Sequence, residues 1–343
     1  MSPFVRALAV HPLLTARCQV AGSTCAQLLQ APPFPGFRRD SMKPLVSILI
    51  NNYNYERFVG DAIESALAQS WARCEVVVVD DGSTDNSRDV IFRFGTRIQT
   101  IFQRNGGQAS AFNTGFKHSR GDIICFLDSD DVFLPNKVAE VVAALDGHER
   151  QWHFHRLQWT DAALNPISMP PYDYETGDYD LRSASRQGNA RLSAPSTSGL
   201  SFTRKLLEQI MPVPEAIKIT SDNYIKYASL ALAPGYCDRN ELVLQRIHGA
   251  NAYTLKGDDN LRGDILLKTA AGLRMHFPAL RKTCSQMCAE GLALHWRSGL
   301  KSADLYREAR EYLSGVTRVE VVEVFTRLGV KAARHCIRSV MTA

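Results

Sequence analysis

The chain has 343 residues, of which 45% are hydrophobic and 22% are charged. A chain of that length forms one large domain, or roughly two smaller ones, around a substantial core. No run approaches the roughly 18 to 20 apolar residues of a membrane-spanning helix, so we predict no such span. The 8 cysteines include no CxxC pair. This spacing argues against a zinc site or a disulfide scaffold and indicates reduced thiols in a cytoplasmic protein.

Positive charge is concentrated at the two ends of the chain. The overall net charge is +5, but residues 262–343 carry 14 basic and 7 acidic side chains, a net of +7. Residues 1–41 carry 4 basic side chains and 1 acidic one, a net of +3, which leaves the middle of the chain at −5. The basic C-terminal part could lie against anionic lipid head groups, or its charges could be the solvated faces of ordinary helices.

The first 41 residues do not share the pattern of the rest of the chain. The apolar stretch at residues 5–14 is interrupted by Arg6 and Pro12, so it resembles a signal peptide only loosely. A regular pattern begins at Met42. We therefore expect residues 1–41 to be a disordered or mis-annotated extension, with Met42 as the functional initiator.

Short apolar runs alternate with amphipathic stretches from residue 45 onward. Fully apolar strands separated by helices indicate a parallel sheet that is covered on both faces. We therefore predict an α/β, Rossmann-like, mostly parallel sheet, and such folds bind ligands beyond the carboxyl ends of their strands. The predicted strands are residues 45–50, 75–79, 97–102 and 122–127, and the helices between and after them are residues 59–67, a helix after residue 85, residues 109–118 and a helix that begins after Pro135.

The pattern is less regular in the second half of the chain. Residues 153–159 and 241–253 each indicate a strand, and residues 220–233 indicate a helix. Residues 166–181 are rich in Pro, Gly and acidic side chains, which predicts a mobile or substrate-facing loop. From about Leu261 to the end the chain is predicted to be mainly helical.

An acidic cluster follows the last strand of the first half. The run CFLDSDDVFLP contains Asp128, Asp130 and Asp131 directly after apolar residues. Aspartates one residue apart suit a hard divalent cation that retains positions for diphosphate oxygens. A DxD string alone is more often a polar turn that caps a strand. Here a second acidic turn, VVVVDDGSTD, ends another strand of the same sheet, and that context favours the metal interpretation.

Further polar groups fall at the same predicted edge. Asp80 and Asp81 could accept hydrogen bonds from a nucleobase or a ribose, or could cap a helix. A tyrosine of NNYNYERF could stack on a base or anchor its loop. Asn105 and the glycines after it, starting with Gly106, allow a close backbone approach to phosphate or ribose. Asn113 lies on the following helix, where we expect it to point into the same cleft.

Together these four segments resemble the nucleotide-binding half of glycosyltransferase family 2, which has a GT-A type fold. The segments are INNYNYERF, VVVVDDGSTDNS, RNGGQASAFNTGF and CFLDSDDVFLP, in the family's order. The resemblance is close over residues 45–134, and the four-part combination is highly specific. It implies a nucleotide-binding half at 42–135, an acceptor half at 136–255 and a helical region at 256–343.

The resemblance also implies roles for residues of the nucleotide-binding half. Asn52, Tyr53 and Asp81 would contact the base and ribose, with Asp80 beside them. Asp128 would support the ribose or the metal. Asn105, Gly106 and Asn113 complete the predicted donor-binding set, and Asp130 would be the principal metal ligand.

Two weaker segments extend the resemblance downstream. The family's catalytic base lies in an acidic pair that opens a helix, and SDNYIKY offers Asp222 there, with Ser221 in place of the usual Glu. The segment QRIHGAN is similar to the family's YRxHxxN ending. This likeness implies that Arg246 contacts the donor diphosphate and that His248 is a second metal ligand.

The resemblance implies an inverting enzyme that transfers one sugar from a nucleotide-diphosphate sugar, usually a UDP-sugar in this family. It further implies an Mn²⁺ or Mg²⁺ cofactor and a glycan or lipid-linked acceptor in bacterial-type cell-envelope or polysaccharide synthesis. The QxxRW motif of processive synthases is absent from the matching region, which favours single-sugar transfer. We expect no nucleic-acid partner, and we expect a cytoplasmic protein whose basic C-terminal helices can rest on the inner membrane surface.

Other classes of protein share parts of this pattern. A nucleotidyltransferase is expected to have a Gly-rich, basic loop after the first strand, where this chain has NNYNYERF. A dinucleotide-dependent oxidoreductase would have GxGxxG at that point. The main alternative is a catalytically inactive homologue that binds a nucleotide sugar or a glycan. Asp222 distinguishes the two possibilities, because only an enzyme needs a base.

Overall fold

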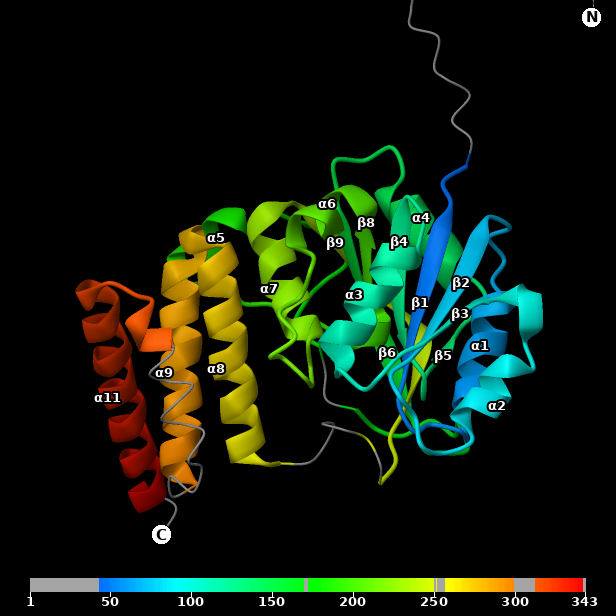
Figure 1. The fold of residues 1–343 in the computed structure, drawn as a ribbon. Coiled ribbons are helices and arrows are strands. Elements are labelled where there is room, and N and C mark those ends of the chain that lie inside the picture. Colours follow the sequence, from blue (N-terminus) through cyan, green and yellow to red (C-terminus); the bar gives the residue numbers. More distant parts are fainter. Residues whose placement is uncertain (1–42, 170–171, 250, 252–256, 299–311, 342–343) are drawn as a thin grey trace, which may run out of the picture. The chain divides into compact units, whose positions relative to one another are not determined.

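A computed structural model of the protein describes residues 43–169, 172–249, 251, 257–298 and 312–341. The expectations for residues 1–41 and for Met42 lie outside these residues. In the part of the chain that is described, one sheet has helices on both faces, and a group of helices follows it toward the C-terminus (Figure 1).

The described strands form a single mixed sheet. They are β1 (Val46–Asn52), β2 (Cys74–Asp80), β3 (Gln99–Phe102), β4 (Ile123–Asp128), β5 (Val132–Phe133), β6 (Trp152–Thr160), β7 (Gly177–Tyr179), β8 (Leu200–Thr203) and β9 (Gly235–Arg246). Their order in the sheet is β3-β2-β1-β4-β8-β6-β9-β5, and β7 pairs with β9. The first four strands of that order are parallel to one another, whereas β8 is antiparallel to both of its neighbours.

Helices alternate with the strands and then continue without them. The α-helices are α1 (Val59–Leu67), α2 (Ser87–Phe92), α3 (Gln108–His118), α4 (Lys137–Leu145), α5 (Arg182–Gln187), α6 (Arg204–Ile210), α7 (Asp222–Leu232), α8 (Asp259–His276), α9 (Arg281–Arg297) and α11 (Arg318–Met341). Short 3₁₀ helices are η1 (Gly95–Arg97), η2 (Thr197–Gly199) and η3 (Pro278–Leu280).

The predicted fold class is confirmed. The parallel strands β1 to β4 and the helices α1 and α3 lie close to the positions that the hydrophobic pattern predicts. Two elements differ from expectation. β7 lies inside the predicted loop at 166–181, and β9 begins at Gly235 rather than near residue 241. The two differences have one cause, because β7 is antiparallel to the early part of β9, with Tyr179 opposite Gly235.

The parallel strands are buried on both faces, which explains their continuous apolar sequences. Successive side chains of a strand point to opposite faces. Ile48 and Ile50 of β1 therefore join the core that α1 and α4 cover, whereas Leu49 joins the core that contains Phe112 of α3. This packing leaves the carboxyl ends of the strands as the edge that helices do not cover.

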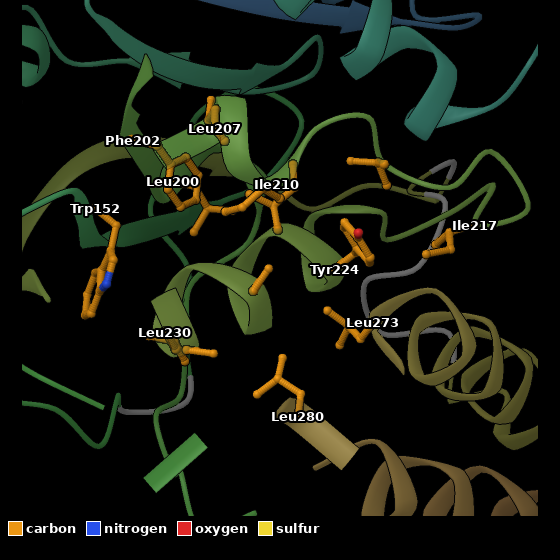
Figure 2. Packing of buried hydrophobic residues seen from close by; sticks show 14 of the residues in the cluster. Trp152, Leu200, Phe202, Leu207, Ile210, Ile217, Tyr224, Leu230, Leu273 and Leu280 are labelled. Carbon is orange, nitrogen blue, oxygen red and sulfur yellow. The ribbon is translucent and has the colours of Figure 1, made fainter. Parts of the chain in front are cut away.

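The core on the α3 face continues into the C-terminal helices. Figure 2 shows side chains of α6, α7, α8 and η3 that converge around Tyr224. The Tyr224 hydroxyl lies 2.7 Å from Nδ1 of His276, at the end of α8. The helices α8, α9 and α11 pack side by side beyond α7 (Figure 1). None of the described helices is both long enough and apolar enough to cross a membrane.

A buried ion pair fastens α11 to α8. The Arg274 guanidinium donates hydrogen bonds of 2.7 and 3.2 Å to the two carboxylate oxygens of Glu320, whose side chain is only 1% exposed. These bonds from Arg274 hold the pKa of Glu320 down, at about 2. A bidentate pair of this kind restricts the orientation of both helices.

We predict that Glu320→Gln lowers the free energy of unfolding at pH 7 by about 2 kcal/mol, because it removes a charge-assisted pair. A depressed carboxyl pKa stabilises the fold above the pKa of the unfolded chain, and that contribution is lost as pH falls through the folded pKa. The difference between wild type and variant should therefore shrink from about pH 4.5 toward pH 2. Urea denaturation at several pH values measures it. Glu323→Gln on the same helix, which removes the more exposed i, i+4 pair with Arg327, is the control and should change stability by less than about 0.5 kcal/mol.

Candidate active site

A cleft of about 1010 Å³ lies at the carboxyl ends of β1, β2 and β4. One wall consists of these strand ends and the start of α3, and the other consists of residues 194–197 and 218–226, which include the start of α7. The predicted site residues that line this cleft are Asn52, Tyr53, Asp81, Asn105, Asp128, Asp130 and Asp222.

The acidic cluster after β4 is crowded. Burial and the neighbouring charges of Asp130 and Asp222 raise the pKa of Asp128 to about 7. Burial and the charges of Asp130 and Asp128 likewise raise the pKa of Asp131 well above its ordinary value. Carboxylates this close together repel one another when ionised, so the cluster is an electrostatically favourable place for a cation.

Asp131 has a structural role within the cluster. Its carboxylate accepts a 2.5 Å hydrogen bond from the Ser198 hydroxyl and a 3.1 Å bond from the backbone N–H of Arg246. These bonds tie the acidic turn to η2 and to the end of β9. Asp128, Asp130 and Asp131 all line the cleft, and Asp131 fixes the turn that carries them.

Asp130 is surrounded by groups from the segment after β9. Its Oδ2 atom lies 3.2 Å from Nε2 of His248 and accepts a 3.1 Å hydrogen bond from the Asn251 side chain. The same Asn251 amide also binds the carbonyl oxygen of Arg246, and its oxygen accepts from the His248 backbone N–H. Arg246, His248 and Asn251 are therefore linked to one another, and His248 and Asn251 contact Asp130.

Asp130 and His248 fit a metal site that a substrate completes. Across the described ranges no group of three or more His, Cys, Asp or Glu side chains is arranged to hold a metal ion. One carboxylate remains a suitable donor, because Mg²⁺ sites commonly take their other ligands from substrate phosphates and water. An imidazole suits a transition-metal ion better than Mg²⁺. The excess of negative charge around Asp128 adds to the attraction for a cation.

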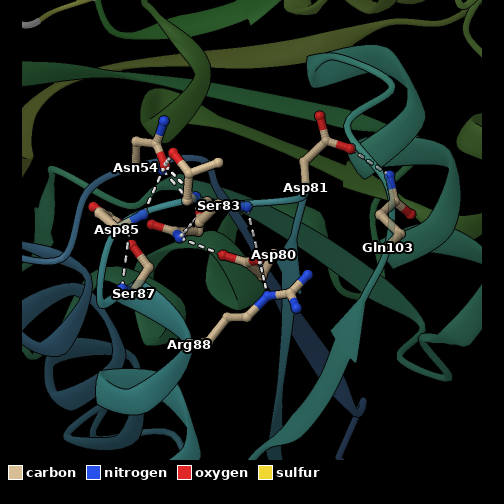
Figure 3. A network of polar contacts seen from close by, with 10 residues as sticks. Asn54, Asp80, Asp81, Ser83, Asp85, Ser87, Arg88 and Gln103 are labelled. Atoms are coloured by element: carbon tan, nitrogen blue, oxygen red, sulfur yellow. Dashed lines mark hydrogen bonds and ion pairs between the residues drawn. The ribbon is translucent and has the colours of Figure 1, made fainter.

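Asp81 joins the end of β2 to the loop before α3. Its carboxylate accepts hydrogen bonds from the backbone N–H groups of Gly106 and Gly107, at 2.9 and 2.7 Å, and from the Gln103 side chain at 2.7 Å. Figure 3 shows Asp81 turned toward Gln103 and away from the network around Asp80. The glycines thus allow a close approach of the backbone, as predicted, but to Asp81 and Lys218: a Cβ atom on Gly107 would lie 2.7 Å from the Lys218 side chain.

Asn52 lines the cleft and carries one unsatisfied side-chain atom. Its amide nitrogen donates to Asp80 and to the Ser83 hydroxyl, at 2.8 and 3.1 Å. Its oxygen atom is buried and has no hydrogen-bond partner among the described residues. A buried polar atom without a partner is costly unless a ligand or water satisfies it. Tyr53, 45% exposed, lies beside it at the cleft.

Asp222 is the first residue of α7 and lines the same cleft as the strand ends. It is close enough to Asp128 for its charge to raise the pKa of that carboxyl. Its own carboxylate forms a 2.9 Å ion pair with Lys226, one turn further along the helix. The predicted base and the predicted metal-binding cluster therefore face the same space.

Two residues predicted to bind the donor do not reach the cleft. Asp80 is fully buried, and its oxygens accept from Asn52, from the Ser83 backbone and from Arg88 (Figure 3). The expectation that Asn113 points into the cleft is wrong: both ends of its amide bind the backbone of Val213, at 2.7 and 2.8 Å. These side chains hold loops in place.

Three further predicted residues lie beside the cleft. The Arg246 guanidinium lies over the Phe58 ring and pairs with Asp61 at 2.5 Å, so it is turned away from the acidic cluster. His248 reaches the site through its contact with Asp130 and packs its ring against Phe58. Gly106 contributes its N–H to Asp81.

Sequence reasoning missed several residues that shape the site. Asn251 is part of the RIHGAN segment, so its position could have been inferred from the resemblance. Gln108 had no such signal. Its amide bridges both walls, because its oxygen accepts from the Ser221 N–H at 2.9 Å and its nitrogen lies 3.4 Å from Asp128. Lys226 could have been found from its helical i, i+4 spacing to Asp222.

Comparison with known proteins agrees with this architecture. The family model described as Glycosyl transferase family 2 matches residues 47–201. An uncharacterized glycosyltransferase of Nostoc sp. is 38% identical over 60% of this chain and 66% of its own length. One of Rickettsia typhi is 37% identical over 62% of this chain and 67% of its own length. The chain thus spans about two thirds of the length of these relatives.

A solved structure and one relative of defined activity extend the comparison. S. aureus TarS 1-349 in complex with UDP-GlcNAc has a TM-score of 0.58 over 85% of this chain and 91% of that chain, at 16% identity, which shows a common fold. The Escherichia coli protein WfgD, a UDP-Glc:alpha-D-GlcNAc-diphosphoundecaprenol beta-1,3-glucosyltransferase, is 41% identical over 27% of this chain and 38% of its own length. From its sequence relatives and its fold, this chain belongs to glycosyltransferase family 2.

Proposed function

We propose that the chain is an inverting, metal-dependent glycosyltransferase that moves one sugar from a nucleotide-diphosphate sugar to an acceptor hydroxyl. The observation that carries the proposal is the meeting of two acidic groups in one cleft. Asp128 is the last residue of β4 and Asp130 lies just after it, on one wall. Asp222 is the first residue of α7, on the other. Sugar transfer needs such a pair, because the departing diphosphate must be stabilised while the attacking hydroxyl loses its proton.

We assign the strand-end wall to the donor. Asn52, with its unsatisfied oxygen, and Tyr53 are positioned to contact the base and ribose, and Asp128 to accept from the ribose. Asp81 supports this surface by holding the loop of Gly106 in place. UDP appears in the names of both the TarS complex and WfgD, and we propose a UDP-sugar as the donor of this chain.

Asp130 and His248 are the residues that would hold a divalent metal ion. Such an ion, Mn²⁺ or Mg²⁺, acts as a Lewis acid toward the diphosphate, on which negative charge grows as the anomeric bond breaks. Asn251 orients Asp130 by donating to its Oδ2 atom. The backbone N–H of Arg246 donates to Asp131 and so links the end of β9 to the acidic cluster, while the Arg246 guanidinium pairs with Asp61.

Asp222 is the residue that we assign as the general base. An acceptor hydroxyl is too weakly acidic to attack unaided, so a carboxylate must accept its proton as the new bond forms. The opposite placement of Asp222 and the donor wall suits an attack from the far side of the sugar. One displacement of that kind inverts the anomeric configuration.

We predict that Asp222→Asn lowers the rate of transfer by about 10²- to 10⁴-fold, because the amide cannot accept the proton. Binding of the nucleoside diphosphate should stay within about twofold of wild type, since the donor wall is intact. UDP release from UDP-sugars in the presence of Mn²⁺ measures the first quantity, and UDP titration measures the second. Asp146→Asn, at the exposed end of α4, is the matched control. Nucleotide binding without turnover in the wild type would support an inactive homologue instead.

We also propose that the acceptor is a glycan, in lipid-linked form, and that the protein touches the inner membrane surface. The net charge of +7 in residues 262–343 supports contact with anionic head groups. WfgD is named for a diphosphoundecaprenol acceptor, which suits the same setting. The proposal places this chain in cell-envelope or polysaccharide synthesis.

Flotation with vesicles tests the membrane contact. We expect the protein to float with vesicles that contain an anionic lipid at low salt, and to be released at high salt, because screening weakens attraction between charges. Vesicles of zwitterionic lipid are the control. Absence from the vesicle fraction at low salt would contradict the membrane contact while leaving the transferase proposal intact.

A further inference from the structure

Lys226 occupies a defined place on the acceptor wall of the cleft. Its ammonium lies 2.9 Å from Oδ2 of Asp222 and donates a 3.2 Å hydrogen bond to the carbonyl oxygen of Pro195. The two charged side chains are only 12% and 7% exposed. Since both partners are largely shielded from solvent, this pair differs from the weak ion pairs of exposed helix surfaces.

The cleft that contains this pair is lined by more acidic than basic side chains. The charged lining residues are five aspartates, which are Asp81, Asp128, Asp130, Asp131 and Asp222, and two lysines, which are Lys218 and Lys226. Lys218 directs its ammonium to the carbonyl oxygen of Gly106, 2.6 Å away on the donor wall. Among the described lining residues, Lys226 is therefore the cation that is paired with the predicted base.

The backbone at the start of α7 is already fixed by other contacts. The Ser221 N–H donates to the Gln108 side chain at 2.9 Å, and the Ser221 hydroxyl donates to the carbonyl oxygen of Ile217 at 2.6 Å. The remaining freedom of Asp222 is the rotation of its side chain. The ion pair with Lys226 removes that freedom, because it holds Oδ2 on the side of the helix that faces Pro195.

We propose that Lys226 is a positioning residue for the reaction, which holds the carboxylate of Asp222 in orientation. This inference rests on the proposed function, in which Asp222 is the base. Oδ2 is engaged by the ammonium, so Oδ1 is the atom that receives the proton of the acceptor hydroxyl. The oxygen of the acceptor then bonds to the anomeric carbon, and the bond from that carbon to the diphosphate breaks.

The surrounding groups explain why such a partner is needed. Asp222 shares the cleft with the acidic residues Asp128 and Asp130. Lys226 carries the opposite charge from one turn along the same helix, and its ammonium attracts Oδ2 of Asp222 at 2.9 Å. That attraction opposes rotation of the Asp222 side chain away from its place in the cleft.

The test compares kcat and KM for wild type, Lys226→Met and Lys226→Arg. The probe is UDP release from UDP-glucose and UDP-GlcNAc with Mn²⁺, with water as the acceptor. We expect Lys226→Met to lower kcat at least about tenfold, because the carboxylate of Asp222 loses its fixed orientation. Lys226→Arg should restore most of the wild-type kcat, and KM for the donor should stay within about twofold. Lys205→Met, on the exposed face of α6, is the matched control.

Each outcome decides the proposal. An unchanged kcat in Lys226→Met would overturn it, and so would a loss of kcat in Lys226→Arg as large as that in Lys226→Met. Should Lys226→Met fail to fold by thermal melting, Lys226→Gln, which keeps a hydrogen-bond donor without charge, is measured in its place. Full activity in Asp222→Asn would refute the base assignment separately. Absence of turnover in wild type would refute the proposed function and, with it, the role of Lys226.

Discussion

The crowding of carboxylates at one edge of a parallel sheet is the constraint on which the rest of this structure depends. Parallel strands end together, so polar residues that follow them meet without further design. Here Asp128 ends β4, Asp130 and Asp131 follow it, and Asp222 of α7 lines the same cleft. Burial, together with repulsion from Asp130 and Asp222, raises the pKa of Asp128 to about 7. Much of the polar structure around the cleft serves to hold these charges in place.

The aspartates at these strand ends also fix the loops around the cleft. The oxygens of Asp80 and Asp131 accept hydrogen bonds from Ser83, Arg88, Ser198 and backbone N–H groups. Asp81, which lines the cleft, accepts from the backbone N–H groups of Gly106 and Gly107. Each adjacent pair of aspartates therefore holds loops together as well as placing a carboxylate at the cleft.

The sequence predicts the donor half well because its signals are local. The apolar stripe of α1 and the runs of β1, β2 and β4 are set by periodicity within each segment. The parts that were missed depend on partners far along the chain. β7 forms because it pairs with β9, and Asn113 is turned toward Val213, 100 residues away. No local pattern could show that the Asn113 amide is already occupied.

The acceptor wall is the part that sequence describes least. The family resemblance predicts the role of Asp222, but only the structure shows that Gln108 and Lys226 lie next to it. The core beneath α7 also extends to α8, through Tyr224 and His276. The orientation of the predicted base thus depends on residues beyond the boundary that we predict at residue 255, and we propose that the helical region stabilises the acceptor wall.

The most direct test of the central claim is the thermal stability of the protein with UDP, in the presence of Mn²⁺ and in the presence of EDTA. A ligand that binds the folded state stabilises it by about 2.7 kcal/mol at one hundred times its Kd. Our account predicts that UDP raises the melting temperature only with the metal, in a concentration-dependent manner, and that Asp130→Asn abolishes the effect. A melting temperature that no nucleoside diphosphate changes, with or without metal, would contradict the assignment of this cleft as a donor site.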